Sequence, residues 1–146
     1  MGTLAVVALV GRLVVLFALL LLLPLGLAVI EGDAAESAFT MAAALTLCAG
    51  LGMSLATRRF RRELQPRDGF LLVGLTWLVL PLFGALPLWL AIPGLSVTDA
   101  YFEATSAFTA TGATALSGLD ALPLSVNAWR CFMMLVGGLG IIVLAV

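Results

Sequence analysis

Four long apolar stretches restrict the possible fold of this chain more than any other feature of its sequence. They cover residues 13–30, 37–56, 69–92 and 127–146. A helix rises 1.5 Å per residue and the hydrocarbon core of a bilayer is about 30 Å thick, so about 20 apolar residues can cross it. Pro24, Pro81 and Pro87 lie inside these stretches, but membrane helices tolerate proline. The sequence therefore predicts an all-α polytopic membrane protein.

The composition excludes several classes of function. Hydrophobic residues make up 63% and charged residues 10% of the chain, whereas soluble domains carry about 25% charged residues. Histidine and lysine are absent, which removes the commonest general base and metal ligand. We expect no enzyme activity, no bound cofactor and, with a net charge of −1, no nucleic-acid partner. Cys48 and Cys131 lie in apolar stretches and are expected to be reduced packing residues.

Charged loops predict the orientation in the membrane. Basic residues mark the cytoplasmic side, and five arginines follow the second stretch: Arg58, Arg59, Arg61, Arg62 and Arg67. The N-terminus is then cytoplasmic, and the acidic loop 31–36 lies outside. A cleaved signal peptide is the alternative for the first stretch, but signal cores usually have 7 to 15 apolar residues. We therefore interpret it as a span.

The interval between the third and fourth stretches contains a helix-start signature, "SVTDAYFEATSAF". Ser96 or Thr98 can cap a helix, and Asp99 and Glu103 suit the positive end of its dipole. A helix from Asp99 to about residue 109 has roughly three turns and a length of about 16 Å. It would reach about halfway across the hydrocarbon core. Its negative end would then point at the membrane centre, where it favours a cation.

The run "TATGAT", residues 109–114, follows this predicted helix. Irregular backbone at membrane depth persists only where protein buries it or where it lines a water-filled cavity. Gly112 can adopt positive φ, which can turn successive carbonyls to one side, as in potassium filters. No carboxylate lies in the run, so it suits a monovalent cation better than a divalent one. The alternative is that Thr109, Thr111 and Thr114 cap or pack an ordinary outer loop.

Other polar and small residues are interpreted more simply. The acidic set Asp99, Glu103 and Asp120 lacks a basic or nucleophilic partner, so we expect capping and attraction of cations at an entrance rather than acid–base chemistry. Arg130 either reaches the outer interface or pairs with an acid of the loop. Gly137, Gly138 and Gly140 are typical of close helix packing rather than of a dinucleotide fingerprint.

The segment "YFEATSAFTATGATALSGLDALP", followed by "NAWRCFMMLVGGLGIIVLAV", resembles the first pore repeat of the Trk/Ktr/HKT potassium transporter superfamily, and in particular the bacterial TrkH-type subunit. The resemblance implies a channel-like pore built from four helix–pore helix–helix repeats. It implies that potassium binds through the backbone carbonyls of Thr111 and Gly112. The flanking filter positions would be Thr109, Ala110, Ala113 and Thr114, with Ala110 where related chains often have Thr.

The resemblance also implies an organisation and partners. Residues 1–62 would hold two leading helices and a basic loop. Residues 63–146 would form the first repeat, with pore helix 98–109, filter loop 109–115 and last span 127–146. A potassium-uptake subunit of the bacterial inner membrane is implied to be a homodimer with a cytoplasmic nucleotide-binding regulator of the TrkA type. With one repeat present, we expect a fragment of a longer transporter. The alternatives are a homotetramer of single repeats and a non-conducting four-span module.

Overall fold

The computed structural model describes residues 2–57 and 65–145, and these residues form helices joined by short connections. The bounds are α1 Gly2–Leu20, α2 Leu22–Glu31, α3 Glu36–Thr57, α4 Pro66–Ala91, α5 Val97–Phe108, the 3₁₀ helix η1 Leu119–Ala121 and α6 Leu124–Ala145. The predicted all-α class is confirmed for this part of the chain. Of the predicted basic loop, Arg67 lies exposed in the first turn of α4, and its other four arginines lie outside the described residues.

The described part of the chain contains three helical segments long and apolar enough to cross a membrane: Leu4–Glu31, Glu36–Thr57 and Arg67–Ala91. The fourth predicted stretch is also helical, as the 22-residue α6. It begins three residues earlier than predicted, directly after Pro123. Many of the large apolar side chains on these helices are exposed, including those of Ile30, Phe70 and Leu78, as expected for surfaces that contact lipid.

Prolines act differently in the first and third spans. Pro24 has no N–H to donate to the Leu20 carbonyl, and α1 ends at Leu20 before α2 continues. Pro81 and Pro87 instead lie inside the unbroken α4. At the start of α4 a proline occupies the first helical position, and the Asp68 carboxylate accepts a hydrogen bond from the Gln65 N–H at 3.0 Å. The first turn of α4 is therefore capped from both directions.

The core lies between α1, α3, α4 and α6, around Trp129. This side chain is 1% exposed, and its Nε1 donates to the Gly84 carbonyl of α4 at 2.9 Å. Its ring lies 5.3 Å from that of Phe17 and 6.5 Å from that of Phe39, between centroids. The two cysteines are free, but both are exposed on this chain. The expectation that they pack inside is therefore wrong, because their positions face outward from their helices.

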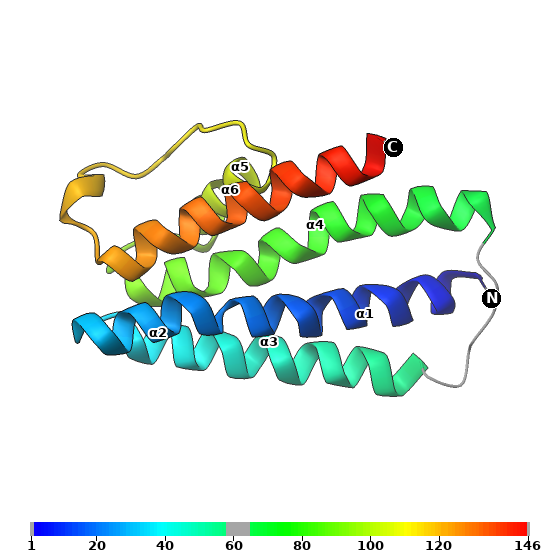
Figure 1. Cartoon of the computed structure of the whole chain (residues 1–146), viewed down its shortest axis with the longest axis horizontal. Coiled ribbons are helices and arrows are strands. Elements are labelled where there is room, and N and C mark those ends of the chain that lie inside the picture. Colours follow the sequence, from blue (N-terminus) through cyan, green and yellow to red (C-terminus); the bar gives the residue numbers. More distant parts are fainter. Residues whose placement is uncertain (1, 58–64, 146) are drawn as a thin grey trace.

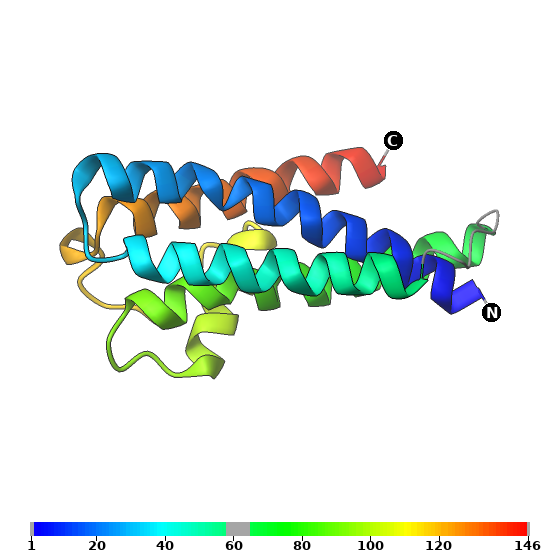
Figure 2. The same ribbon diagram turned by 90° about the horizontal axis from the view of Figure 1, so that it is seen from below.

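Different helix ends and turns lie at the two ends of the bundle (Figures 1 and 2). The start of α1, the end of α3, the start of α4 and the end of α6 lie at one end. The α2–α3 and α4–α5 turns lie at the other, and α5 folds back from there along α4 and α6. At this end the Asp33 carboxylate accepts hydrogen bonds from the Ser125 hydroxyl at 2.6 Å and from the Ala35 N–H at 2.9 Å. The α2–α3 turn is thus joined to the start of α6.

Candidate functional site

The short helix α5 begins with a side-chain cap. The Ser96 hydroxyl accepts from the Asp99 N–H at 3.0 Å and donates to the Asp99 carboxylate at 2.7 Å. Of the two candidate caps, Ser96 therefore forms the cap, and Thr98 lies exposed in the first turn. The helix covers Val97–Phe108, one residue earlier at each end than the predicted 98–109. Its 12 residues have a length of about 18 Å.

The far end of α5 lies near the middle of the long helices. The Phe108 ring packs edge-on against Trp77 of α4 at 5.8 Å and lies 5.6 Å from Phe17 of α1. The backbone of Phe108 also lies directly against Gly137 of α6. Trp77 precedes the end of α4 by 14 residues, which is about 21 Å along a helix. The chain therefore leaves α5 well inside the bundle rather than at its surface end.

The loop after α5 has an alternating backbone. Ala110 has a φ of 53° and Gly112 a φ of 75°, whereas Thr111 between them and Ala113 after them are not in the positive region. In a strand with uniformly negative φ, successive carbonyls point in opposite directions, so reversing φ at every second residue can bring them to one side. Among the described residues, no hydrogen bond ends on the carbonyl oxygens of Ala110, Thr111, Gly112 or Thr114.

Two contacts with α5 shape the inner half of this loop. The Ser106 carbonyl accepts from the Thr111 N–H at 2.9 Å, and the Ser106 hydroxyl donates to the Ala113 carbonyl at 2.6 Å. The Ala113 carbonyl therefore faces α5, unlike those of the four residues named above. The hydroxyls of Thr109 and Thr111 lie 2.7 Å apart. All six residues 109–114 are exposed on this chain.

Ala110 is a non-glycine residue in the left-handed region, which costs an L-residue about 1 to 2 kcal/mol. We expect Ala110→Gly to leave the melting temperature nearly unchanged, because the strain removed is offset by the greater freedom of glycine in the unfolded chain. Ala110→Val should lower it, since a β-branched residue tolerates positive φ poorly. Thermal unfolding of the purified chain measures both. Ala115→Val, in the same loop at ordinary φ, is the control, and an equal loss there would contradict this explanation.

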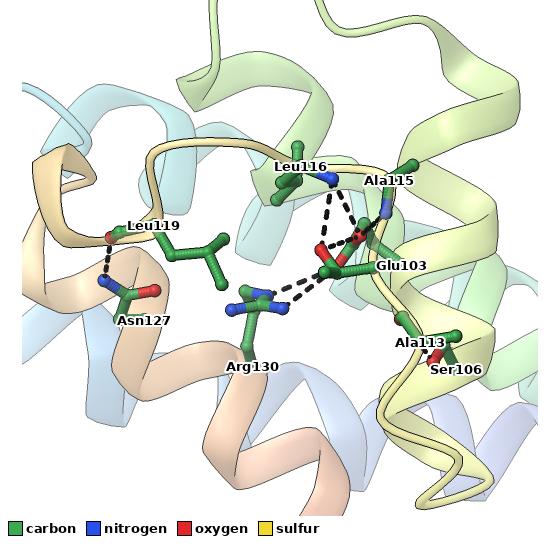
Figure 3. A network of polar contacts seen from close by, with 9 residues as sticks. Glu103, Ser106, Ala113, Ala115, Leu116, Leu119, Asn127 and Arg130 are labelled. Atoms are coloured by element: carbon green, nitrogen blue, oxygen red, sulfur yellow. Dashed lines mark hydrogen bonds and ion pairs between the residues drawn. The ribbon is translucent and has the colours of Figure 1, made fainter.

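Glu103 is the centre of a buried polar network in Figure 3. Its side chain is 1% exposed. Oε1 accepts from the Thr114 hydroxyl and the Ala115 N–H, both at 2.5 Å, and from the Leu116 N–H at 3.3 Å. Oε2 accepts from Nη2 and Nε of Arg130 at 3.1 and 3.3 Å. Glu103 therefore binds the loop instead of lying at an entrance, and of the two roles left open for Arg130 the structure has the ion pair.

Two small cavities flank the loop. One of about 90 Å³ lies between the loop, α5 and α6, and its lining includes Glu103, Gly112 and Arg130. The other, of about 150 Å³, is lined by residues of α5 and the loop, including Thr105, whose hydroxyl is buried without a partner in the described structure. The parts of the chain that the structure describes contain no group of three or more His, Cys, Asp or Glu that could hold a metal ion.

Sequence reasoning missed several residues of this site. Ser106, Asn127 and the amides of Ala115 and Leu116 were not singled out. Asn127 donates to the Leu119 carbonyl at 2.8 Å and fixes the end of the loop on α6. A signal existed for Ser106, because residues three apart lie on one face of a helix and Ser106 follows Glu103 at that spacing. No local pattern indicates the amides, whose acceptor lies 12 and 13 residues away.

Membrane-length helices, packed around a half-length helix and an exposed loop, define a polytopic helical membrane protein. The family model of TrkH, described as a cation transport protein, matches residues 35–146. The chain belongs to this family. The resemblance in the loop and the last span is therefore confirmed at the level of the family.

Individual relatives cover nearly the whole chain. The Trk system potassium uptake protein TrkH of Salmonella typhimurium is 45% identical over 143 residues, and that of Halomonas elongata is 42% identical over 142 residues. Each comparison covers 97% of this chain and 30% of the relative. The crystal structure of the potassium transporter TrkH from Vibrio parahaemolyticus matches with a TM-score of 0.92 at 42% identity, covering 99% of this chain and 31% of that one. The chain thus spans about 30% of the length of these relatives.

Proposed function

We propose that this chain contributes one strand of a potassium-selective pore used for potassium uptake. In this proposal residues 63–146 form a helix–pore helix–filter loop–helix repeat, and residues 1–62 supply the leading helices and the basic loop. The observation that carries it is the loop 109–115, in which φ alternates and the carbonyls of Ala110, Thr111 and Gly112 accept no hydrogen bond among the described residues. All three of these residues are exposed on this chain. Potassium would bind through the carbonyls of Thr111 and Gly112, with Thr109, Ala110, Ala113 and Thr114 beside them.

The position of α5 supports this proposal electrostatically. A helix carries about half a negative charge at its C-terminal end, and α5 ends deep among the long helices, against Trp77 and Gly137. A dehydrated cation near that end gains from the helix dipole and from carbonyl oxygens that replace its water shell. Asp99, exposed at the outer end of α5, would raise the local cation concentration at the entrance.

The absence of a free carboxylate along the loop supports a monovalent ion. Divalent cations are usually held by carboxylates. Among the residues that the structure describes, the one buried carboxylate beside the loop is that of Glu103, and it is already bound by Arg130 and by loop donors. The oxygens left for an ion are neutral carbonyls and the hydroxyls of Thr109 and Thr111.

One loop forms one side of a ring, so further loops must complete the site. We propose that they come from additional repeats of a longer chain; a ring of four copies of this chain is the alternative. We also propose a bacterial inner-membrane location with a cytoplasmic N-terminus, a homodimeric complete subunit and a cytoplasmic nucleotide-binding regulator of the TrkA type. These proposals rest on the family and on the charge of the loops.

The test compares two glycines of the same loop. Gly112 and Gly118 both have positive φ, 75° and 68°, and an added Cβ would meet nothing within 4 Å at either position. Alanine at either site therefore carries a similar backbone cost, about 1 to 2 kcal/mol. Only Gly112 lies in the proposed filter. Gly112→Ala and Gly112→Ser should abolish potassium uptake or its selectivity over sodium, whereas Gly118→Ala should retain both.

Uptake is measured in potassium-uptake-deficient cells. They carry a chimera in which this chain replaces the matching 30% of the Salmonella typhimurium relative. Immunoblots of membranes control for protein level. Equal transport by the Gly112 and Gly118 variants would refute the filter proposal and favour the non-conducting module. Uptake by the 146-residue chain alone would favour the ring of four copies.

A further inference from the structure

We propose that Glu103 and Arg130 are positioning residues that set the place and the charge of the loop 109–116. Through this pair α6 holds α5, and α5 holds the outer half of the loop. The inference rests on the proposed function for its effect on ion selectivity. Its structural part, the holding of the loop, is measurable without transport.

The geometry of Glu103 shows how completely its carboxylate is used. Three donors from consecutive residues converge on Oε1, namely the Thr114 hydroxyl and the N–H groups of Ala115 and Leu116. Two donors of Arg130 bind Oε2. A carboxylate offers about four lone-pair sites, so five donors leave no oxygen free for a passing ion. The carboxylate therefore acts as a clamp rather than as a cation ligand.

The loop has two points of attachment to α5. Ser106 holds its inner half through the Thr111 N–H and the Ala113 carbonyl, and Glu103 holds its outer half. These two residues lie three apart on one face of α5. The backbone of Thr111 and Gly112 lies beside the inner attachment, and its carbonyls remain unpaired. Their positions relative to any ion thus depend on both attachments.

Arg130 fixes the position of the Glu103 carboxylate and neutralises its charge. Arg130 belongs to α6 and donates two hydrogen bonds to one oxygen of Glu103. The side chain of Glu103 is 1% exposed and that of Arg130 is 21% exposed. Without the guanidinium, Glu103 would be a buried carboxylate without a charged partner, which is strongly destabilising. It would also place a negative charge behind the proposed filter, where it attracts cations regardless of their size.

Charge and hydrogen bonding are separable by substitution. E103Q keeps an oxygen for the loop donors but turns an amide N–H₂ toward the Arg130 guanidinium, so that donor faces donor. R130Q leaves the carboxylate without its cation. The double variant E103Q/R130Q restores a donor and an acceptor across the pair and has no charge. Glu36→Gln and Arg12→Gln, at exposed positions of α3 and α1, are matched controls for the loss of one charge each.

The first measurement is amide hydrogen exchange of a peptide containing residues 114–116 in the purified chimera. We expect exchange to be faster in E103Q and R130Q and to recover at least partly in the double variant. In E103Q the loop amides lose hydrogen bonds to a charged group, which contribute about 1.5 to 3 kcal/mol, so exchange in this variant should rise at least about tenfold. If exchange is unchanged in both single variants, Glu103 and Arg130 do not hold the loop, whatever the transport results.

The second measurement is the ratio of potassium to sodium uptake at equal amounts of membrane protein. We expect this ratio to fall about tenfold or more in each single variant and to stay unchanged in the two controls. A purely structural pair would lower the amount of protein and leave the ratio unaltered, which would also overturn the inference. A normal ratio in Gly112→Ala would refute the proposed filter itself. A ratio altered by Gly112→Ala but not by R130Q would refute only the positioning role.

Discussion

Replacing Gly137 by alanine is expected to destabilise the bundle by about 3 kcal/mol, the upper end of typical overpacking costs. A Cβ at this position would overlap the carbonyl oxygen, carbonyl carbon and Cα of Phe108. These are backbone atoms at the end of α5, so no side-chain rotation relieves the overlap. Either α5 or α6 must move, and the loop that starts at Thr109 must move with it. Thermal unfolding of the purified chain measures the loss.

Gly138 provides the matched control, because a Cβ there would meet nothing within 4 Å in the described structure. Gly138→Ala adds the same methyl group to the same helix and gains up to about 1 kcal/mol of helix propensity. It should therefore be neutral or stabilising. Equal behaviour of the two variants would contradict the close approach of α5 to α6.

Trp129→Ala is expected to cost about 3 to 5 kcal/mol, as for other large-to-small changes of buried aromatic residues. The ring packs against Phe17 and Phe39 and joins α6 to α1 and α3. Between helices in lipid, association depends on van der Waals packing rather than on the hydrophobic effect, so the cavity left by the ring removes contacts directly. The melting temperature of the purified chain and the amount of protein in the membrane should both fall.

Two further tryptophan variants separate packing from hydrogen bonding. Trp129→Phe keeps most of the ring but removes the hydrogen bond to Gly84, and interhelical hydrogen bonds in membranes contribute about 0.6 kcal/mol on average and at most about 1.7. Its cost should therefore be well below that of alanine. Trp89→Ala removes the same residue type at a position that is 45% exposed and should have little effect. A loss in Trp129→Phe as large as in Trp129→Ala would show that the hydrogen bond dominates.

The sequence predicts the helices of this chain well because their determinants are local. Length and apolar content indicate α3, α4 and α6, and the capping pattern near Ser96 predicts α5 to within one residue at each end. The predicted stretch 127–146 begins three residues after the observed start of α6, because the helix begins directly after Pro123. The family was identified from the loop and the last span, and the family match bears this out.

The contacts that hold the loop were less predictable because they join residues far apart in the sequence. The sequence predicts that Glu103 lies in or near the first turn of α5 and attracts cations at an entrance, yet it is buried and bound to Arg130, 27 residues away. The glycines of "VGGLGII" were expected to pack closely, and this holds for Gly137. Which of them meets a backbone depends on the rotation of α6 about its axis, and the sequence pattern does not determine that rotation.

The hydrogen bond between Asp33 and Ser125 shows that these two residues lie at the same end of the bundle, and this determines whether the number of passes between them is even or odd. Between these residues the chain runs the length of the bundle twice, in α3 and α4, while α5 and the loop after it return to the end where they began (Figure 2). The unit formed by α4, α5, the loop and α6 therefore makes an even number of passes. Tandem duplication of such a unit keeps every copy in the same orientation, whereas duplication of a unit with an odd number of passes inverts alternate copies.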